Sequence, residues 1–443
     1  MRDEGARTTQ GVEPDPDVPG WLFVDLDQTL LKGDLLWEGL LGLLRSSPLR
    51  CLLIPFWILA GRAAFKQKLA RAVSFSPADL PYRDSVLALI RTAHDEGRKV
   101  VLASASPRVW VQAVADHLGG FDAVLATEGD LNLKSETKLA AIQALCADEP
   151  FEYVGDSPAD IPIWKASARA TLVEPRRGLE EALSEGTLVK VVSDAVPEGL
   201  GSLLLRELRP PQWVKNTLVF APLFLAHEWS EGWRLASAVW AFVAFCVVAS
   251  AGYVFNDLID LGNDRAHAEK RSRPIASGAL PVSAAFLLLG FLASAFIALA
   301  VLVLAGATTA MLLLYLVLTF SYSFYFKRRL ILDVLLLAGL YGHRLLTGGI
   351  AADVMISPWL LVFSAFLFLS LALVKRYSEL SLLPESHEDE IRGRAYTKAD
   401  MPGVQALGQA CGMMSILVLC LYVSSEDVAM LYRSPALLWG VVP

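Results

Sequence analysis

The chain has 443 residues, of which 54% are hydrophobic and 19% are charged, and its mean hydropathy is +0.45. These averages hide two halves: residues 1–200 contain 21 Lys/Arg and 29 Asp/Glu, whereas residues 201–443 contain 18 and 17. The soluble composition of the first half and the charge-poor, apolar composition of the second exclude a single soluble domain and wholesale disorder. No basic excess points to nucleic acid as a partner.

Residues 1–19 are acidic, contain proline and have no apolar core, so we expect a disordered tail and not a signal peptide. From residue 20 to residue 193, short apolar runs alternate with helix-like stretches. This alternation predicts a Rossmann-like α/β domain with a parallel sheet covered by helices on both faces. The predicted strands are 21–24, 100–103, 151–154 and 170–173, and the helices between them include 84–96 and 107–118.

A helical insertion at residues 35–80 follows the first predicted strand, and we expect it to form a cap. Within it, residues 49–60 are apolar and are flanked by Arg50 and Arg62. They are too few to cross a membrane, which takes about 20 residues. Two interpretations stay open: a helix buried inside the cap, or a helix that lies on the membrane interface.

The second half predicts an all-α transmembrane bundle from residue 209 to 443, joined to the first domain by a linker at 194–208. Residues 217–226 form a short apolar segment, and an eighth segment begins near Ser434 and ends after about ten residues, so we expect the bundle to be incomplete at its C-terminus. The full-length apolar segments are 235–255, 282–303, 308–325, 331–350, 357–374 and 403–423.

Loop charges predict the orientation of this multi-pass protein. The loops near 256–280, 326–330 and 375–402 together carry twelve Lys/Arg, whereas the opposite loops carry only Arg234 and Arg433. Because positive loops stay on the cytosolic side, we expect a bacterial-type inner or plasma membrane protein with a cytosolic N-terminal domain. The five cysteines form no CxxC pair, so we expect reduced thiols and no zinc site.

A first group of reactive residues follows the predicted strands. Asp25 and Asp27 come directly after the first strand, where one carboxylate can attack phosphorus while the other protonates the leaving oxygen. Ser104 ends the second strand, where its hydroxyl can bind a phosphoryl oxygen. Either Lys138 or Lys134 can neutralise a phosphorylated aspartate. After a later strand, Asp156 and Asp160 lie four residues apart, and both can hold Mg²⁺ through oxygen atoms.

In this order and spacing, the four motifs resemble the haloacid dehalogenase-type phosphatases that have a helical cap after the first motif. The resemblance implies that Asp25 is the nucleophile and Asp27 the acid and base. It also implies that Ser104 and Lys138 stabilise phosphate, Lys138 because it opens a predicted helix. The implied metal ligands are the Asp25 side chain, the Asp27 backbone carbonyl, Asp156 and Asp160. A domain that keeps the fold without turnover, as a regulatory module, is the alternative.

A second group of acids follows the second apolar segment. Asp257, Asp260 and Asp264 are spaced i, i+3 and i+7, which places them on one face of a helix. Three carboxylates at a membrane edge need compensation, and Mg²⁺ carrying a pyrophosphate would provide it. The basic run from Lys270 to Arg273 follows and can bind phosphate.

This acidic motif, together with the run Arg-Pro-Ile-Ala-Ser-Gly at 273–278, resembles the UbiA superfamily of intramembrane prenyltransferases. The resemblance implies a bundle with a cytosol-facing cavity that binds a Mg²⁺-diphosphate and a polyprenyl chain. The residues expected to bind substrate are Lys215, Asn216, Asn256, Arg265, Lys270, Arg273, Lys327, Arg344 and Lys375. For Lys327 and Lys375, anchoring under the positive-inside rule is the alternative.

The branch of the superfamily matters because the reactions differ. Members that act on aromatic acceptors usually have a second motif with two or more aspartates, whereas the equivalent loop here has only Asp333. That loop and the blocks at 209–216 and 373–380 resemble the decaprenyl-phosphate phosphoribosyltransferases. The resemblance implies that a polyprenyl phosphate attacks C1 of phosphoribosyl pyrophosphate. The α/β domain would then dephosphorylate the product. The alternative is a prenyltransferase that uses a prenyl diphosphate and an aromatic or other acceptor.

Overall fold

The computed structural model describes residues 18–441 except 75, 129–132, 176–177, 182, 184–187, 195–197, 383–394, 426–427 and 429–434. Nearly all of the expected tail at 1–19 lies outside the described residues, and so do Arg392, Arg394 and Arg433 of the loop-charge count. The chain divides into two units. The first contains residues 1–204 and 257–287, and the second contains residues 205–256 and 288–443.

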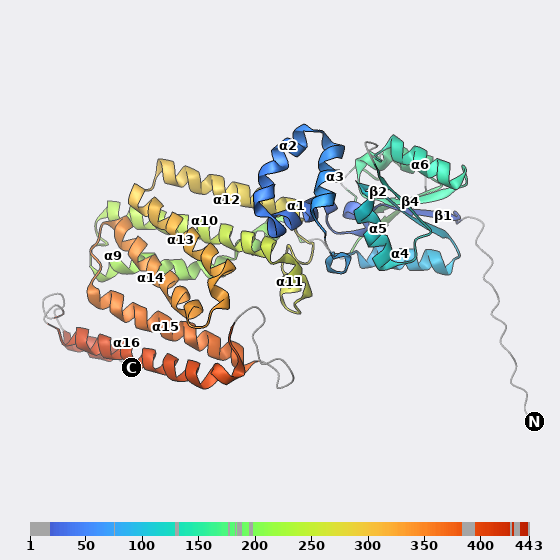
Figure 1. Ribbon diagram of the computed structural model, residues 1–443. Helices are drawn as coiled ribbons and strands as arrows, with labels where there is room; N and C mark the ends of the chain where they lie inside the picture. Colours follow the sequence, from blue (N-terminus) through green and yellow to red (C-terminus); the bar gives the residue numbers. More distant parts are fainter. Residues whose placement is uncertain are drawn as a thin grey trace, which may run out of the picture. The chain divides into compact units, whose positions relative to one another are not determined.

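The first unit is built on a six-stranded parallel sheet, which confirms the α/β class (Figure 1). Its order is β3-β2-β1-β4-β5-β6. The strands are β1 (Trp21–Val24), β2 (Lys99–Pro107), β3 (Ala123–Thr127), β4 (Phe151–Gly155), β5 (Arg169–Val173) and β6 (Leu188–Val192). The four predicted strands are present, and β3 and β6 were not predicted. The central strands β1 and β4 are buried throughout, because both faces of a parallel sheet are covered.

Alternate residues of β1 point to opposite faces and form two hydrophobic cores. Leu22 and Val24 pack in one core with residues of α4 (Asp84–Asp95) and α5 (Arg108–Leu118). Trp21 and Phe23 pack in the other core with residues of α6 (Glu136–Cys146) and α7 (Ile161–Ala166). The carboxyl ends of the strands are thereby left for polar residues.

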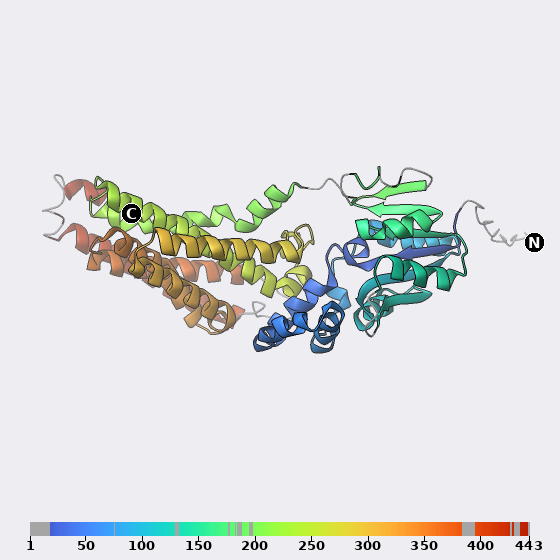
Figure 2. The same ribbon diagram turned by 90° about the horizontal axis from the view of Figure 1, so that it is seen from above.

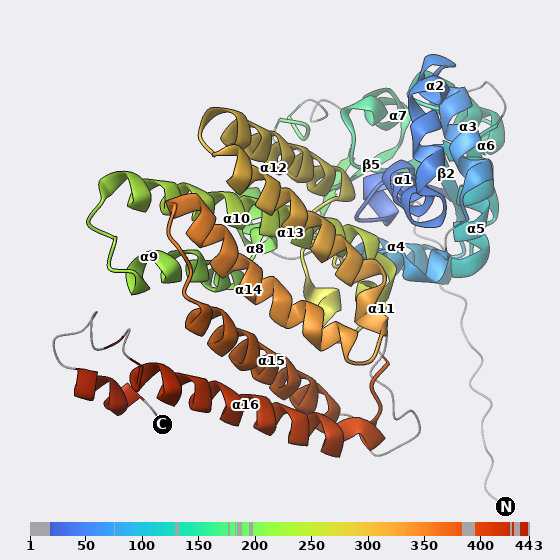
Figure 3. The same cartoon turned by 60° about the vertical axis from the view of Figure 1, so that its left-hand side comes forward.

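The cap lies between β1 and β2, as expected, and Figures 1 and 3 show its helices together beside α5. It consists of α1 (Leu35–Ser46), the 3-10 helix η2 (Pro48–Leu53), α2 (Ile54–Leu59) and α3 (Arg62–Ala72). The two chain segments that connect the cap to the sheet lie side by side and form a narrow neck. Leu31 and Tyr82 form an antiparallel bridge, and the Lys32 amide donates to the Pro81 carbonyl at 2.9 Å. The interpretation of 49–60 as a buried helix is wrong for one face, because Leu49 and Leu59 are 80% and 84% exposed.

The second unit is helical, and Figure 2 shows its long helices running side by side. Among the described residues, six helices are long and apolar enough to cross a membrane. They contain α10 (Gly232–Ile259), α12 (Val282–Leu302), α13 (Gly306–Phe324), α14 (Leu332–Ala352), α15 (Pro358–Ser381) and α16 (Met401–Val423).

Three shorter segments differ from the predicted bundle. Residues 217–226 are not a span, because they fold into the 3-10 helix η5 (Pro210–Phe220) and the short helix α9 (Ala221–Leu225). The expected linker contains helix α8 (Leu200–Leu208). The last described segment, Pro435–Val441, is a short 3-10 helix.

Candidate functional sites

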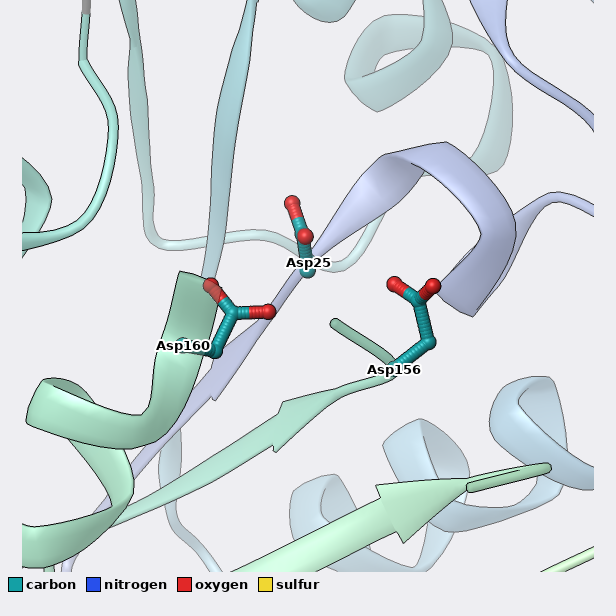
Figure 4. Close-up of side chains that lie close together, drawn as sticks. All are labelled: Asp25, Asp156 and Asp160. Carbon is teal, nitrogen blue, oxygen red and sulfur yellow. The ribbon is translucent and has the colours of Figure 1, made fainter. Parts of the chain in front are cut away.

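Three carboxylates converge where β1 and β4 end (Figure 4). Asp25 follows β1, Asp156 follows β4, and Asp160 ends the 3-10 turn Pro158–Asp160. Each offers an oxygen within 4.8 Å of the other two. Neighbouring parallel strands end at the same edge of the sheet, so residues about 130 positions apart meet there.

Lys138 lies beside this carboxylate group. Its Nζ is 3.1 Å from Asp25 Oδ1 and 3.7 Å from Asp160 Oδ1, and it donates to the Tyr153 hydroxyl at 2.9 Å. Tyr153 in turn donates to Asp160 at 3.1 Å. Lys138 is buried within α6, whereas Lys134 is exposed. The lysine that can neutralise charge on Asp25 is therefore Lys138.

The Asp27 carboxylate points into a different set of donors. Its Oδ2 accepts from the hydroxyls of Ser104 at 3.2 Å and Ser106 at 2.7 Å, and its Oδ1 accepts from the Leu35 amide at 2.8 Å. The side chain of Asp27 is not one of the three grouped carboxylates. It is instead held by the end of β2 and the first residue of α1, which orients it separately from Asp25.

Burial of this many acids shifts their proton equilibria. Burial raises the pKa of Asp25 to about 8, against the opposing effect of Lys138. Burial likewise raises the pKa of Asp156 to about 6. Burial alone would lower the pKa of Lys138, but Asp25 and Asp160 outweigh it, so the pKa of the amine is raised. The cluster carries more acids than its lysine can neutralise.

The donor set fits Mg²⁺. Asp160 Oδ2 is buried and has no hydrogen-bond partner, and it belongs to the carboxylate group formed with Asp25 and Asp156. A buried carboxylate oxygen without a partner costs free energy, and a hard cation that prefers oxygen ligands would compensate it. Thr29 orients Asp156 by donating to its Oδ1 at 3.1 Å.

The second acidic motif does not lie on one continuous helix, so that part of the prediction is wrong. Helix α10 ends at Ile259, and α11 (Leu261–Ala266) begins after a turn at Asp260. Asp257 and Asp264 nevertheless meet, because Arg273 NH1 lies 3.0 Å from Asp257 Oδ1 and 2.5 Å from Asp264 Oδ2. Both carboxylates are buried, and the guanidinium supplies positive charge between them.

The other predicted residues of this region have separate positions. Lys270 Nζ is 3.8 Å from Asp264 Oδ1. Arg265 turns away from the aspartates and forms an ion pair with Glu38 of α1, at 2.6 Å and within the first unit. Asn256 is half-buried in α10.

In the second unit, Arg344 of α14 is the centre of a buried polar cluster. Its Nε donates to Asn216 Oδ1 at 2.9 Å, and its NH2 donates to the Tyr315 hydroxyl at 2.9 Å. The rings of Phe245, Tyr315 and Tyr341 lie within 6 Å of the guanidinium carbon. Two predicted residues 128 positions apart, Asn216 and Arg344, are thus brought into contact inside the membrane domain.

The remaining predicted cations lie outside this cluster. Lys215 donates to Gln212 at 2.6 Å, Lys327 is half-buried in a 3-10 turn, and Lys375 is exposed on α15. Its neighbour Arg376 is the buried cation: Arg376 donates to Asp333 at 2.5 Å, and both side chains are fully buried. Arg376 was not among the predicted site residues. Asp333 is the only acid in the predicted segment 331–350, which forms the helix α14 that packs on α15.

Three further residues were missed in the α/β site. Ser106 lies two residues after Ser104 and binds the same carboxylate, and Tyr153 connects Lys138 with Asp160. Lys66 of α3 donates to the Ala105 carbonyl at 3.0 Å, which links the cap to the end of β2. The Ser-x-Ser spacing at a strand end was a usable signal for Ser106. Nothing local to Lys66 or Tyr153 marks them.

The comparisons with known proteins match both units. A family model described as haloacid dehalogenase-like hydrolase matches residues 22–165, and one described as the UbiA prenyltransferase family matches residues 216–442. The uncharacterized protein y4nM of Sinorhizobium fredii is 39% identical over 430 residues, which cover 94% of this chain and 81% of that protein.

Two further similarities concern the helical half. The decaprenyl-phosphate phosphoribosyltransferase of Mycolicibacterium smegmatis is 38% identical over 190 residues, which cover 42% of this chain and 59% of that enzyme. The solved structure of a UbiA homolog from Archaeoglobus fulgidus bound to GPP and Mg²⁺ is 16% identical, with a TM-score of 0.43, over 54% of this chain and 84% of that one.

The fold and the two sites therefore define an integral membrane enzyme with several membrane spans, in which a haloacid dehalogenase-like domain precedes a helical domain of the transferase type. The chain belongs to the UbiA prenyltransferase family, whose model matches residues 216–442.

Proposed function

We propose that the helical domain transfers a phosphoribosyl group from phosphoribosyl pyrophosphate to a polyprenyl phosphate, and that the α/β domain hydrolyses a phosphate monoester, with the new lipid as its substrate. The observation that carries the proposal is the group of Asp25, Lys138, Asp156 and Asp160 beside a separately held Asp27. It supplies each chemical role that phosphoryl transfer through an aspartate requires.

In the hydrolase reaction, the Asp25 carboxylate attacks phosphorus and the bond from phosphorus to the leaving oxygen breaks. Asp27, oriented by Ser104 and Ser106, gives a proton to that oxygen. Water then attacks the phosphorus of the aspartyl phosphate and passes a proton to Asp27, while the bond from phosphorus to the Asp25 oxygen breaks, which frees inorganic phosphate and restores the Asp25 carboxylate. Lys138 holds negative charge on Asp25 and on the transferred group. Asp25, Asp156 and Asp160 would hold Mg²⁺, which would neutralise phosphoryl oxygens when bound.

In the transferase reaction, an oxygen of the polyprenyl phosphate attacks C1 of the ribose, and the bond from C1 to pyrophosphate breaks. Asp257, Asp260 and Asp264 are the candidate Mg²⁺ ligands, and Arg273 and Lys270 supply phosphate-binding charge. In the second unit, Arg344 with Asn216, and the cations Lys215, Lys327 and Lys375, are the candidate contacts to the phosphorylated substrates.

The state of Asp333 favours the phosphoribosyl branch. A second metal-binding motif would need carboxylates that can turn toward a cation, but Asp333 is fully buried and paired with Arg376 and the Tyr322 hydroxyl. Because Arg376 of α15 neutralises Asp333 of α14, this acid stabilises the contact between the two helices and is not available to a metal ion. The named relative from Mycolicibacterium smegmatis supports the same branch.

The orientation is also proposed here: the α/β domain and the loop that carries Asp257 to Arg273 lie on the cytosolic side, since positive residues gather in the loops on that side. Phosphoribosyl pyrophosphate is a soluble anion, so both sites would be reached from the aqueous phase of one compartment.

The test is mass spectrometry of lipids after membranes that contain the chain are incubated with phosphoribosyl pyrophosphate, polyprenyl phosphate and Mg²⁺. The wild type should form a phosphoribosyl lipid and then a ribosyl lipid. Asp257→Asn should form neither, Asp25→Asn should stop at the phosphoribosyl lipid, and the exposed control Asp95→Asn should behave as wild type. Consumption of a prenyl diphosphate in place of phosphoribosyl pyrophosphate would contradict the proposal and favour prenyl transfer.

A further inference from the structure

An apolar surface on the cap has no partner within the described part of the chain. It is formed by the outward side chains of η2 and α2, and we call it the cap patch: Leu49, Leu52, Leu53, Phe56, Ile58 and Leu59. Four of them are between 67% and 84% exposed. The opposite side of the same segment, at Cys51, Ile54 and Trp57, packs on the cap core. The segment is therefore apolar on both sides, and only one side is covered.

The charge around the cap patch selects its occupant. Between Glu38 and Asp79 the chain has six Lys/Arg and no acidic residue, within a half that has a net charge of −8. Arg50, Lys68 and Arg71 are exposed. A second copy of the cap would bring like charges together, whereas an anionic lipid surface would attract them while it buries the apolar side chains.

The bilayer is also within reach of this unit. Residues 257–287 belong to the first unit, and they join α10 to α12, two helices that can span the membrane. A connection between two spans lies at the membrane surface. Within the unit, Arg265 of this connection pairs with Glu38 of α1 in the cap, at 2.6 Å.

We infer that the cap patch inserts into the interfacial layer of the bilayer in which the chain's own helices lie. The 12 residues of Pro48–Leu59 are too few to cross it, so the segment rests in the surface with Leu52, Phe56 and Leu59 among the acyl chains. Through α3, whose Lys66 binds the Ala105 carbonyl, the same cap covers the end of β2 that holds Ser104 and Ser106. This last step rests on the proposed phosphatase function: the contact would hold the phosphatase site close to phosphate groups carried by membrane lipids.

The contact is tested in proteoliposomes of zwitterionic and anionic lipids with the full chain. In a background without native cysteines, an environment-sensitive fluorophore is attached to Phe56→Cys or, as control, to Arg91→Cys on α4. The proposal expects emission at position 56 to be blue-shifted and quenched by doxyl-labelled lipids severalfold more than at 91. Removal of the anionic lipid should weaken the quenching. Equal quenching at both positions would overturn the proposal. A blue shift at position 56 that doxyl-labelled lipids do not quench, and that disappears when the protein is diluted in lipid, would also overturn it, because it would indicate that a second copy of the chain covers the patch.

A second experiment measures the phosphatase activity of the full chain with its native cysteines in place. The variant Leu52→Glu/Phe56→Glu/Leu59→Glu should lose about tenfold or more in kcat/KM for a lipid-borne phosphate monoester, since the chain stays in the membrane but loses the contact that holds the site against the lipid surface. Its rate on soluble p-nitrophenyl phosphate should stay that of the wild type. The control is Leu188→Glu, which changes a leucine of β6 that is 66% exposed and should leave both rates unchanged. If the wild type hydrolyses neither phosphate, the proposed phosphatase fails, while the fluorophore still decides the membrane contact.

Discussion

The side chain of Asp25 is surrounded by charge of both signs, and its chemistry depends on that balance. Lys138 lies 3.1 Å away, and the buried Asp160 and the half-buried Asp156 complete the group. Replacement by asparagine keeps the size of the side chain and removes the nucleophile. We expect Asp25→Asn to lower the phosphatase kcat by a factor of about a thousand or more, measured with p-nitrophenyl phosphate and Mg²⁺. Asp95→Asn, at an exposed position of α4, should keep the wild-type rate; a retained rate in Asp25→Asn would rule out an aspartyl phosphate.

Protons and Mg²⁺ compete for these acids. The pKa of Asp25 is raised to about 8 and that of Asp156 to about 6. At a pH above the ordinary carboxyl pKa and below these values, the metal-free folded protein therefore keeps protons on these acids, whereas the unfolded chain has lost them. The metal-free protein should therefore lose stability as the pH rises from about 4 to about 8. Mg²⁺ needs the ionised acids, so its stabilising effect should grow over the same interval.

Thermal unfolding of the purified chain in EDTA and in Mg²⁺, at pH 5, 6, 7 and 8, measures both trends. Asp156→Asn removes one of the titrating groups and should flatten the pH dependence in EDTA. A Mg²⁺ effect that is the same at pH 5 and pH 8 would contradict the assignment of these acids as ligands.

The pair of Arg376 and Asp333 is the most deeply buried ion pair that the described residues contain, with both side chains fully enclosed. Removing one partner leaves a buried charge without compensation, which costs about 3–5 kcal/mol. We expect Arg376→Gln and Asp333→Asn each to destabilise the helical domain strongly, and the double variant to recover part of the loss. Unfolding in detergent measures this. Lys375→Gln, at the exposed neighbouring position, should change stability little; additive single effects would contradict a coupled pair.

At this scale the sequence predicted the residue types better than their partners. Asp25, Lys138, Asp156 and Asp160 could be predicted to lie together because their motifs are local and follow strands, and the structure places them side by side. Arg376 was missed because Lys375 and Arg376 are adjacent and only the phase of α15 decides which one is buried. Tyr153 looked like an ordinary strand residue, and its hydroxyl acquires a role only when α6 packs against β4.

Helix α14 and η5 approach each other too closely for any side chain at Gly348. A Cβ there would lie 2.0 Å from the Val219 carbonyl oxygen, so the two backbones would have to separate. The same two elements hold Arg344 and Asn216 at 2.9 Å. We expect Gly348→Ala to destabilise the domain by about 1–3 kcal/mol and to lower transferase activity.

Gly339 on the same helix is the matched control, because a Cβ at that position meets nothing within 4 Å. Gly339→Ala should be neutral or slightly stabilising, since alanine favours the helix by up to about 1 kcal/mol. Unfolding in detergent and lipid mass spectrometry separate the two variants. Equal behaviour of both would contradict the close packing of α14 on η5.

The elements that were missed are those with weak patterns. β6 lies at the edge of the sheet and is largely exposed, so its residues lack the continuous apolar run of β1 and β4. The spacing of Asp257, Asp260 and Asp264 predicted one helix, but the chain turns at Asp260, where the ψ angle is 7°. Arg273 then binds across the turn, a contact that helical periodicity cannot foresee.

For the whole chain, the proposed order of reactions predicts an advantage for two sites in one molecule. A lipid product made by the helical domain would meet the attached phosphatase at a high effective concentration. As the comparison, proteoliposomes contain a mixture of Asp25→Asn molecules and Asp257→Asn molecules at a low ratio of protein to lipid. We expect this mixture to accumulate phosphoribosyl lipid before ribosyl lipid appears. The wild type at the same density should show a shorter delay. Equal delays would show that the product diffuses before it is dephosphorylated.

The neck of the cap has a consequence for how such a chain can diversify. Leu31 and Tyr82 bridge the two ends of the insertion, so the roughly fifty residues between them leave and re-enter the sheet at one point. Because the bridge joins the two ends of the insertion, a change of length inside it need not move β1 relative to the rest of the sheet, and longer loops add little closure entropy. We therefore expect the cap to tolerate changes in length while Asp25, Asp156 and Asp160 keep their places at the ends of β1 and β4.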